Sequence, residues 1–449
     1  MVLALALVSI PQVLTGIVVD AAATRERFRV HPFPGGGTLA SPWYTVTIGE
    51  GSSQQASFVW YTANSKRQPI VKGNNVPSLS SKDTSFASFD LSGPTPVTVR
   101  LLNDTGIDHA VVLPTSADIF VSHNPGRQEV TFTIDRPRQV CLIVNQNMDS
   151  PLCIFADPPE INPPTGPSEN LVYFGPGVHH VPGNAINVTA NQSVYLAGGA
   201  HVFGQVRAVP TPANMYCICF CLCLFLVCVS VSLCRFVFAS MCLCLISWLY
   251  HTYSSEQVGV QWNGFWVGGA PCDNVRVFGR GVLDGHNVMI DYRAHAMIEL
   301  PDCTSIRVEG IITIDSPQYQ LNNLNPGAVV LWAKSIAWGF STDGWSGGEQ
   351  SLISDCFSKV NDDSHKLYST GAVVQRSVVW QMENGALFSP QLVFCAFSCD
   401  NQRHMRCLNG GVGRRLPVYD ELERDEQRGI RCCRRQRCHC SREAMAICC

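Results

Sequence analysis

The segment "QSLISDCFSKV" at residues 350–360 consists of short apolar runs interrupted by polar residues, and similar segments recur along the chain. "GAVVQRSVVW" at 371–380 and "CTSIRVEGIITI" at 303–314 have the same character, with Gly or Asn at the corners of such runs. A short, irregular repeat of roughly two dozen residues is typical of a solenoid. The pattern predicts a right-handed parallel β-helix, whose coils stack their strands about 4.8 Å apart. A large antiparallel sandwich or a propeller is the alternative.

Strands of this kind begin with "LVYFGPGVHHV" and continue to about residue 390, which predicts a β-helix domain over 171–390. Residues 40–156 differ, because runs such as "WYTVTIG" and "EVTFTI" alternate apolar and polar residues between turns such as "NDTG". This alternation predicts an antiparallel β-sandwich. The proline-rich segment 157–170 predicts a stiff linker. The expected fold class is therefore all-β, with a sandwich before the β-helix.

The overall charge of the chain limits its partners. Its 449 residues include 32 Lys and Arg against 35 Asp and Glu, a formal net charge of -3. Such a balance lacks the broad positive field that attracts nucleic acid or an anionic membrane. We expect a neutral or mildly charged partner, no nucleic acid, and a monomeric protein.

Cysteines are concentrated in two places, with eight of the 22 between Cys217 and Cys244 and six between Cys432 and Cys449. The other eight are an ordinary number for a large extracellular domain. The apolar start of the chain has a small-residue end near Ala23 and predicts a signal peptide over 1–23. Secretion is the expected route, and three Asn-x-Ser/Thr triplets are compatible with it.

Two segments do not fit the repeat. Residues 215–250 are long and apolar enough for a membrane span, but the sequences on both sides resemble coils of one solenoid. We interpret 211–256 as a hydrophobic insertion foreign to the fold. The Cys- and Arg-rich tail, 391–449, has no strand period and is interpreted as an exposed tail. A zinc site is the alternative there, with ligands Cys433, Cys438, His439 and Cys440.

Three carboxylates carry the chemistry. Asp343 lies in "GFSTDGWSGG", and Asp362 and Asp363 follow 19 and 20 residues later in "KVNDDSHKLYS". In a solenoid with coils of that length, these positions lie on neighbouring rungs of one face. Carboxylates so close cannot all ionise freely, so at least one pKa should be raised, as a catalytic acid requires. One carboxylic acid and one or two carboxylate bases are the catalytic groups used for glycoside hydrolysis, which needs no metal or cofactor.

The same residues have structural interpretations. The Asp in "STDG" can cap a turn, and the "NDD" sequence can be a solvated corner or a calcium site. Adjacent strand residues also point to opposite faces, so the pair Asp362 and Asp363 reaches one side only if the backbone bends or bulges there.

The stretch "VNDDSHKLYSTGAVVQRSVVWQMENGALF", residues 360–388, resembles the dextranases of glycoside hydrolase family 49, which are related to the polygalacturonases of family 28. The resemblance implies an N-terminal sandwich, a right-handed parallel β-helix, and hydrolysis with inversion. It implies that Asp362 is the general acid, and that Asp343 and Asp363 orient and deprotonate the attacking water. Acid and base are then expected roughly 6.5 to 9.5 Å apart.

The resemblance favours an α-1,6-glucan as the substrate, because "SHKLY" is similar to the dextranase pattern. No Gly-His-Gly follows, and the Arg-x-Lys by which polygalacturonases hold a substrate carboxylate is also missing. Around the three carboxylates, Trp345 and Tyr368 are candidates to stack on a sugar, and Lys366 is a candidate to hold a hydroxyl or steer a carboxylate. Asn361 and Asn384 are interpreted as ladder residues at coil corners.

The sequence therefore predicts a secreted, metal-independent, inverting endo-glycosidase that acts on a polysaccharide. Three alternatives stay open. The chain can be a polygalacturonase-type pectin hydrolase, or a β-helix protein that binds carbohydrate without catalysis. A polysaccharide lyase on the same fold is the third, and it would need calcium and a basic catalytic residue.

Overall fold

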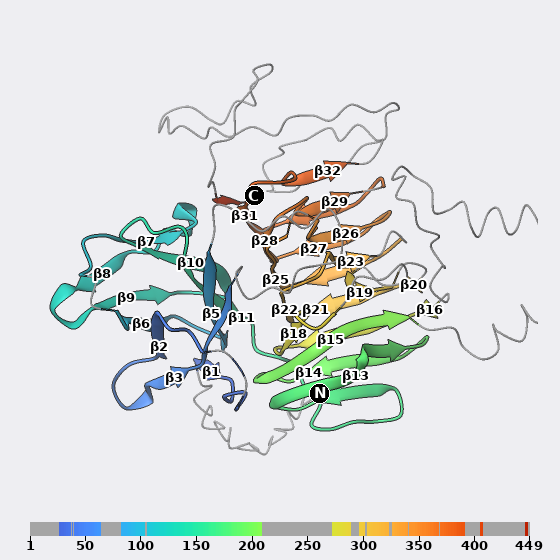
Figure 1. Ribbon diagram of the computed structural model, residues 1–449, viewed down its shortest axis with the longest axis horizontal. Helices are drawn as coiled ribbons and strands as arrows, with labels where there is room; N and C mark the ends of the chain where they lie inside the picture. Colours follow the sequence, from blue (N-terminus) through green and yellow to red (C-terminus); the bar gives the residue numbers. More distant parts are fainter. Residues whose placement is uncertain are drawn as a thin grey trace, which may run out of the picture.

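A computed structural model describes residues 27–36, 38, 40–63, 82–103, 106–208, 272–288, 296–300, 303–322, 326–339, 341–367 and 369–390, and the strand backbones at 405–406 and 445–447. The predicted signal peptide (1–23) and hydrophobic insertion (211–256) lie outside the described residues, as do Tyr368 and nearly all of the tail (391–449). The described chain is all-β, and Figure 1 shows a sandwich beside a stack of parallel strands.

The sandwich contains two antiparallel-rich sheets. The outer sandwich sheet has the order β3-β2-β6-β9-β8, with β3 (Gln55–Ser57), β2 (Tyr44–Ile48), β6 (Thr95–Leu101), β9 (Glu129–Ile134) and β8 (Val121–Asn124). The inner sandwich sheet has the order β1-β5-β11-β10-β7, with β4 also paired to β5; its strands are β1 (Phe28–Val30), β4 (Val59–Ala63), β5 (Asp83–Leu91), β7 (Ala110–Leu113), β10 (Arg138–Val144) and β11 (Leu152–Asp157). Short 3-10 helices are η1 (Gly51–Ser53), η3 (Thr115–Ala117) and η4 (Pro125–Arg127).

The β-helix contains three sets of stacked strands. The first helix sheet has parallel strands β12 (Leu171–Phe174), β14 (Ser193–Leu196), β17 (Arg276–Gly279), β21 (Arg307–Glu309), β24 (Val329–Leu331), β27 (Leu352–Ser354) and β30 (Val373–Gln375), followed by antiparallel β33 (Met405–Arg406). The second helix sheet contains β13 (Gly177–Val188), β15 (Ala200–Ala208), β18 (Val282–Asp284), β22 (Ile312–Ile314), β25 (Lys334–Ile336), β28 (Phe357–Val360), β31 (Val378–Gln381) and β34 (Met445–Ile447).

The third set lies on the remaining side of the coils. The far end of the long strand β15 pairs with β19 (Ala296–Glu299), which pairs with β23 (Tyr319–Asn322). Above them the third helix sheet has the order β26 (Trp345–Gly347), β29 (His365–Leu367) and β32 (Phe388–Pro390). Two short strands, β16 (Cys272–Asp273) and β20 (Cys303–Thr304), pair beside them.

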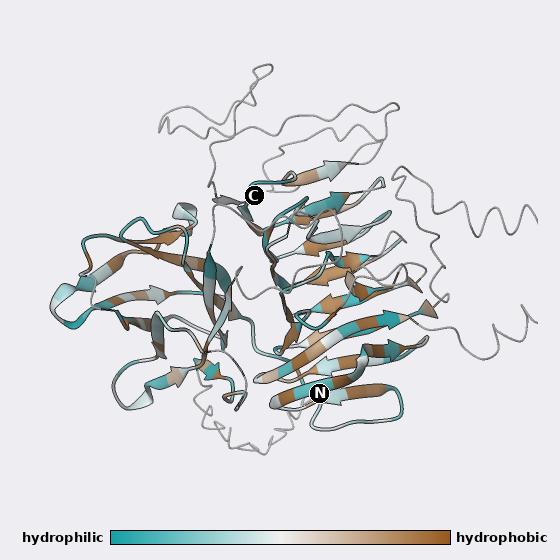
Figure 2. Cartoon of the chain, viewed as in Figure 1, coloured by the Kyte–Doolittle hydropathy of each residue, from teal (hydrophilic) through white to brown (hydrophobic). Residues whose placement is uncertain are grey.

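Stacked apolar residues explain why these sequences coil. In the first helix sheet one interior column runs through adjacent coils: Val194, Val277, Val308, Val330, Ile353 and Val374. All six side chains belong to the apolar core of the β-helix. Figure 2 shows hydrophobic segments recurring in successive strands of the stack. The right-handed parallel β-helix predicted from the repeat is therefore confirmed, because each coil buries its short apolar runs against the next.

The solenoid is continuous on either side of residues 209–271. Strand β14 pairs with β17, and β15 pairs with β18, so the segments before and after this stretch form adjoining coils. A disulfide, Cys272–Cys303, links β16 to β20. Within the described ranges there is no helix that is both long and apolar enough to cross a membrane.

The second helix sheet also has an apolar outer face, because the inner sandwich sheet covers it. Phe86 and Phe155 of the sandwich belong to one buried cluster with Ile336 and Phe357 of the β-helix. Burial on both sides explains why every residue of β22, β25 and β28 is buried, including the polar ones. The sandwich therefore covers the outer face of the second helix sheet, and the apolar cluster between them is separate from the interior core of the β-helix.

Candidate functional site

The three predicted carboxylates meet on one side of the β-helix. Asp343 lies in the loop between β25 and β26, and Asp362 and Asp363 lie one coil later, between β28 and β29. The coils are in register, because the Gly344 amide donates a 2.9 Å hydrogen bond to the Asp363 carbonyl. One carboxylate oxygen from each Asp lies within 4.8 Å of the other two. The sequence spacing thus brings the three groups together.

A backbone bend explains how Asp362 and Asp363, although adjacent in sequence, reach the same side of the β-helix. Residues 361 and 362 form a bend after β28 ends at Val360, so strand alternation does not apply to Asp362 and Asp363. The Asp362 carboxylate accepts a 2.9 Å hydrogen bond from the amide of Asp363. An Asp bonded to the next backbone amide is the side-chain chemistry that favours such a turn.

Glycines on the neighbouring coils make room for this bend. Gly385, with φ +80°, stacks on the peptide between Asp362 and Asp363, and a Cβ there would lie 2.2 Å from the Asp362 carbonyl carbon. On the other side, a Cβ at Gly344 would lie 2.1 Å from the carbonyl oxygen of Ser364. Close backbone approach on both sides requires glycine. The pair is therefore enclosed between two coils that determine its position.

Asn361 is a corner residue, as predicted. It is fully buried, its side-chain amide donates to the Trp338 carbonyl (2.9 Å), and its own amide donates to the Thr342 hydroxyl (3.1 Å). Asn384 has a further role. Its side-chain amide donates a 3.1 Å hydrogen bond to Asp362, so Asn384 contacts the predicted acid directly. The interpretation of Asn384 as a ladder residue alone is incomplete.

Lys366 contacts the carboxylates themselves. Its ammonium forms an ion pair with Asp343 and lies 3.8 Å from the nearer Asp363 oxygen. The Asp343 side chain is only 4% exposed and that of Lys366 19%. Burial lowers the pKa of Lys366 to about 8, so the side chain is charged at neutral pH. The ammonium therefore compensates part of the negative charge of the two carboxylates that it faces.

Tyr319 is a site residue that was not identified from the sequence. It lies on β23, one coil before Asp343, and the Lys366 ammonium is 5.1 Å from the centre of its ring. Burial raises the pKa of Tyr319 to about 12, with further contributions from the charges of Asp362, Glu299 and Asp363. The phenol therefore stays protonated and can donate a hydrogen bond at any ordinary pH. The spacing of 19 and 20 residues that linked Asp343 to the Asp pair does not find Tyr319, which precedes Asp343 by 24 residues.

Trp345 is not a sugar-stacking residue, which corrects the prediction. Its side chain is fully buried in the β-helix core, and its partners in the coil column are His365 and Phe388. The reason is its position: Trp345 begins β26, where the side chain points inward. Tyr368, the other predicted stacking residue, lies outside the described residues.

The site combines three carboxylates, one ammonium and one phenol in a partly buried place. Such a group can transfer protons and can hold a water molecule between carboxylate oxygens. Oxygen ligands of this kind also suit calcium, but Lys366 supplies a positive charge at the position that a cation would take.

Comparisons with known proteins support the fold. No protein-family model matches the chain, and no curated protein matches its sequence. Among solved structures, Dex49A from Penicillium minioluteum, a family 49 dextranase, superimposes with a TM-score of 0.54 at 16% identity, covering 81% of this chain and 72% of that protein. A family 28 exopolygalacturonase from Yersinia enterocolitica gives a TM-score of 0.28 at 11% identity, covering 73% of this chain and 72% of that protein. The first similarity confirms the resemblance at the level of the fold.

Proposed function

We propose that this chain is a glycoside hydrolase that cleaves internal bonds of a polysaccharide at Asp343, Asp362 and Asp363. The observation that carries the proposal is the convergence of these carboxylates within 4.8 Å, on a β-helix with the fold of a dextranase. Separate structural roles for the three residues would not require them to meet. Catalysis requires the three residues to lie close together, because an acid and a base must act on one bond.

The contacts of each carboxylate suggest its role. Lys366 pairs with Asp343 and lies near Asp363, so its positive charge compensates part of theirs, and we assign these two carboxylates to bind and deprotonate water. Asp362 accepts hydrogen bonds from neutral donors, the Asp363 amide and Asn384. Three carboxylates this close cannot all ionise freely, so we assign Asp362 as the acid and expect its pKa above that of an ordinary Asp.

The proposed reaction transfers two protons. One water is held between Asp343 and Asp363, whose oxygens are close enough for two hydrogen bonds of about 2.7 Å each. The water oxygen attacks the anomeric carbon and loses a proton to one of these carboxylates. The bond from the anomeric carbon to the leaving oxygen breaks, and Asp362 donates its proton to that oxygen. Exchange with solvent restores both protonation states.

We propose a neutral α-1,6-glucan of the dextran type as the substrate. Lys366, the cation beside the carboxylates, already forms an ion pair with Asp343, so its charge is not available to a uronate without breaking that pair. Recognition of a uronic acid polymer usually uses a dedicated cation, often a bidentate Arg. A polygalacturonate is the second choice.

Reducing ends released from dextran and from polygalacturonate test the activity and the substrate. The variants are Asp343→Asn, Asp362→Asn and Asp363→Asn in the full chain, and Asp355→Asn is the matched control because it lies at a coil corner, paired with Arg376. We expect release from dextran by the native chain and the control, and loss in the three site variants. Release from polygalacturonate alone would overturn the substrate. An ultraviolet-absorbing, calcium-dependent product would indicate a lyase.

We propose inversion at the anomeric carbon, as the family resemblance implies. Retention is the other stereochemical outcome, and it requires one carboxylate to act as a nucleophile. Proton NMR of the first anomer formed from a dextran oligosaccharide distinguishes the two. Appearance of the β-anomer before mutarotation supports inversion, and the α-anomer contradicts it.

Secretion is proposed as the route of this protein. The disulfides Cys141–Cys153 and Cys272–Cys303 are compatible with an oxidising compartment. Expression in a secreting host should place the protein in the medium with a new N-terminus near Ala23, measurable by N-terminal sequencing. Retention of the intact chain inside the cell would contradict this.

A further inference from the structure

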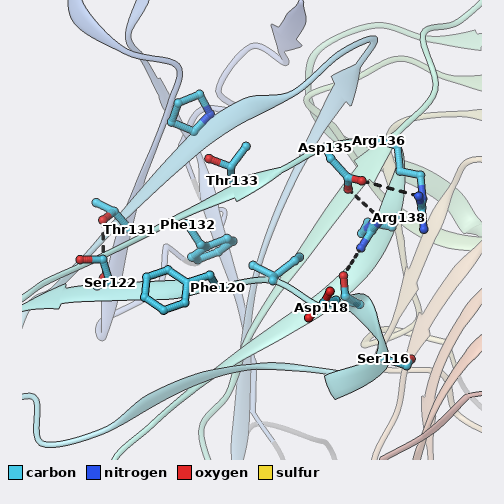
Figure 3. A pocket seen from close by; sticks show the side chains of 13 residues that line it. Ser116, Asp118, Phe120, Ser122, Thr131, Phe132, Thr133, Asp135, Arg136 and Arg138 are labelled. Carbon is cyan, nitrogen blue, oxygen red and sulfur yellow. Dashed lines mark hydrogen bonds and ion pairs between the residues drawn. The ribbon is translucent and has the colours of Figure 1, made fainter.

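We propose that the sandwich carries a second binding site for a neutral polysaccharide chain, separate from the carboxylates. A cavity of about 730 Å³ opens where η3, β8, β9 and the start of β10 meet (Figure 3). Its lining includes Asp118, Phe120, Ser122, Thr131 and Arg138. This volume lies in the range of about 300 to 1,000 Å³ that is usual for small-molecule sites. No lining residue belongs to the candidate active site.

The charges of the cavity balance, which favours a neutral ligand. Its lining has two carboxylates, Asp118 and Asp135, and two guanidinium groups, Arg136 and Arg138, so the formal charges cancel. Both guanidinium groups also face the same partner. Asp135 lies 2.7 Å from Arg138 and 3.6 Å from Arg136, and Arg138 donates to the Ala117 carbonyl at 2.6 Å. The arginines are thus engaged with protein groups, and an anionic ligand would have to break these pairs.

Phe120 presents an apolar surface at this site. Its side chain is 86% exposed, and Figure 3 shows its ring beside Ser122 and Phe132. What distinguishes Phe120 from a single exposed apolar residue is its place in the lining of a cavity that also carries hydroxyl groups. The C–H face of a sugar ring is a suitable partner for such a ring. Hydroxyl groups next to the ring can bond the sugar hydroxyls at the same time.

A row of hydroxyl side chains continues from the cavity across the outer sandwich sheet. Thr47, Thr98, Thr131 and Ser122 stand opposite one another on four adjacent strands. Adjacent strands are about 4.8 Å apart, so the row offers a hydroxyl at each regular step. Thr131 and Ser122 also line the cavity, which joins the row to Phe120. A hydroxyl both donates and accepts hydrogen bonds, as the sugar hydroxyls do.

The occupant assigned to this site is a segment of the same neutral glucan proposed as the substrate, so this inference rests on the proposed function. Neutral charge, an exposed ring and a hydroxyl row match a sugar chain better than a peptide or a phosphate ligand. Binding a polymer at two places on one protein raises the local concentration of substrate at the second place. The sandwich would then retain the polymer while the β-helix cleaves it.

Affinity electrophoresis of the full chain through gels containing dextran or polygalacturonate tests the site. The Asp362→Asn background prevents hydrolysis of the gel polymer. Phe120→Ala removes the ring, and Thr131→Val removes one hydroxyl while keeping the side-chain shape. Phe33→Ala is the matched control, because Phe33 is 58% exposed and does not line the cavity. We expect Phe120→Ala to weaken dextran binding about tenfold and Thr131→Val less, with no change for Phe33→Ala.

The outcomes separate this inference from the proposed function. Equal retardation of all variants by dextran, or no retardation in either gel, overturns the second site, whereas hydrolysis of dextran by the native chain still upholds the function. Retardation by dextran that depends on Phe120, without hydrolysis by the native chain, supports the site and overturns the function. If only polygalacturonate retards the protein, and this retardation depends on Phe120, the proposal that the site binds a neutral polysaccharide is overturned.

Discussion

At the scale of single residues, the ion pair between Lys366 and Asp343 links the electrostatics of the site to its chemistry. Both side chains are largely buried, so their charges interact with little screening by solvent. The ammonium faces two of the three carboxylates, Asp343 and Asp363. Loss of the Lys366 charge should therefore disturb Asp343 and Asp363, the pair proposed to bind water, rather than the acid Asp362.

The charge of Lys366 should determine the alkaline limit of activity. Burial lowers its pKa to about 8, so the side chain is charged below that pH and neutral above it. Activity is expected to fall as the pH rises through about 8. Lys366→Arg, which keeps its charge at high pH, should move this limit upward, and Lys366→Met should lower activity at every pH. A limit near pH 8 that is the same in Lys366→Arg would contradict the role.

The assignment of Asp362 as the acid predicts a selective rescue. Asp362→Asn should lower dextran hydrolysis about 100- to 10,000-fold, as the loss of a general acid does. A 4-nitrophenyl glycoside has a leaving group that needs no proton, so the same variant should cleave it at a rate close to that of the native chain. Asp363→Asn should remain inactive on both substrates. Rates of nitrophenol release measure this, and rescue of Asp363→Asn instead would reverse the roles.

Spacing alone identified the three carboxylates, because coil length determines which residues become neighbours. Residue spacing did not predict whether a single side chain points into the core or toward the site. Trp345 follows the Asp343 loop in sequence, yet it begins a strand and points into the core. Tyr319 was missed because no motif marks it, although it stacks one coil before Asp343. Orientation at a loop-to-strand junction depends on where the strand begins, which the sequence does not define.

At the scale of the elements, the coil after the Asp pair determines its position. Gly385 and Gly371 have nearly equal positive φ angles, +80° and +75°. A Cβ at Gly385 would overlap the backbone of Asp362, whereas at Gly371 the nearest atom is a Gln350 side-chain carbon at 3.4 Å. The two glycines thus carry the same conformational strain on substitution and differ in what lies next to them.

This difference predicts unequal effects of alanine at the two positions. Gly371→Ala should cost roughly 1 kcal/mol of stability from the positive φ, and Gly385→Ala should cost more, because its Cβ would also overlap the Asp362 backbone. Gly385→Ala should in addition shift the Asp pair and lower the rate of dextran hydrolysis about 100-fold. Thermal unfolding and hydrolysis rates measure the two effects separately. Equal activity of both variants would show that Gly385 does not position the pair.

The strands of the β-helix were predictable, but their outer environment was not. The interior column of the first helix sheet, for example Val308 and Val330, follows from the short apolar runs. In the second helix sheet, by contrast, Ile336 and Phe357 point outward and are buried only because the sandwich covers them. A local pattern cannot indicate which apolar residues are covered by a distant part of the chain.

At the scale of the whole molecule, the sandwich and the β-helix share one interface that contains buried charges. Lys334 of β25 forms an ion pair with Asp157 at the end of β11, and Arg280 donates to Asp90 at 2.8 Å. Lys334 and Asp157 are fully buried, and burial lowers the pKa of Lys334. Removing one member of such a pair leaves an uncompensated charge in a dry interface.

The interface therefore predicts strong coupling between Asp157 and Lys334. Asp157→Leu should lower the free energy of unfolding by about 3–5 kcal/mol, because Lys334 is then buried without its partner. The double variant Asp157→Leu with Lys334→Met should recover most of that loss. Denaturant unfolding of the two single variants and the double variant measures the coupling. Additive losses would mean that the pair does not join the two domains.

Reducing-sugar release from dextran by the native chain and by Asp362→Asn tests most directly whether the three carboxylates form a catalytic site. The native chain should release reducing ends at a steady rate, and Asp362→Asn should be about 100- to 10,000-fold slower while unfolding at the same temperature. Equal rates for the two proteins, or no release from any polysaccharide by a correctly folded native chain, would contradict the assignment.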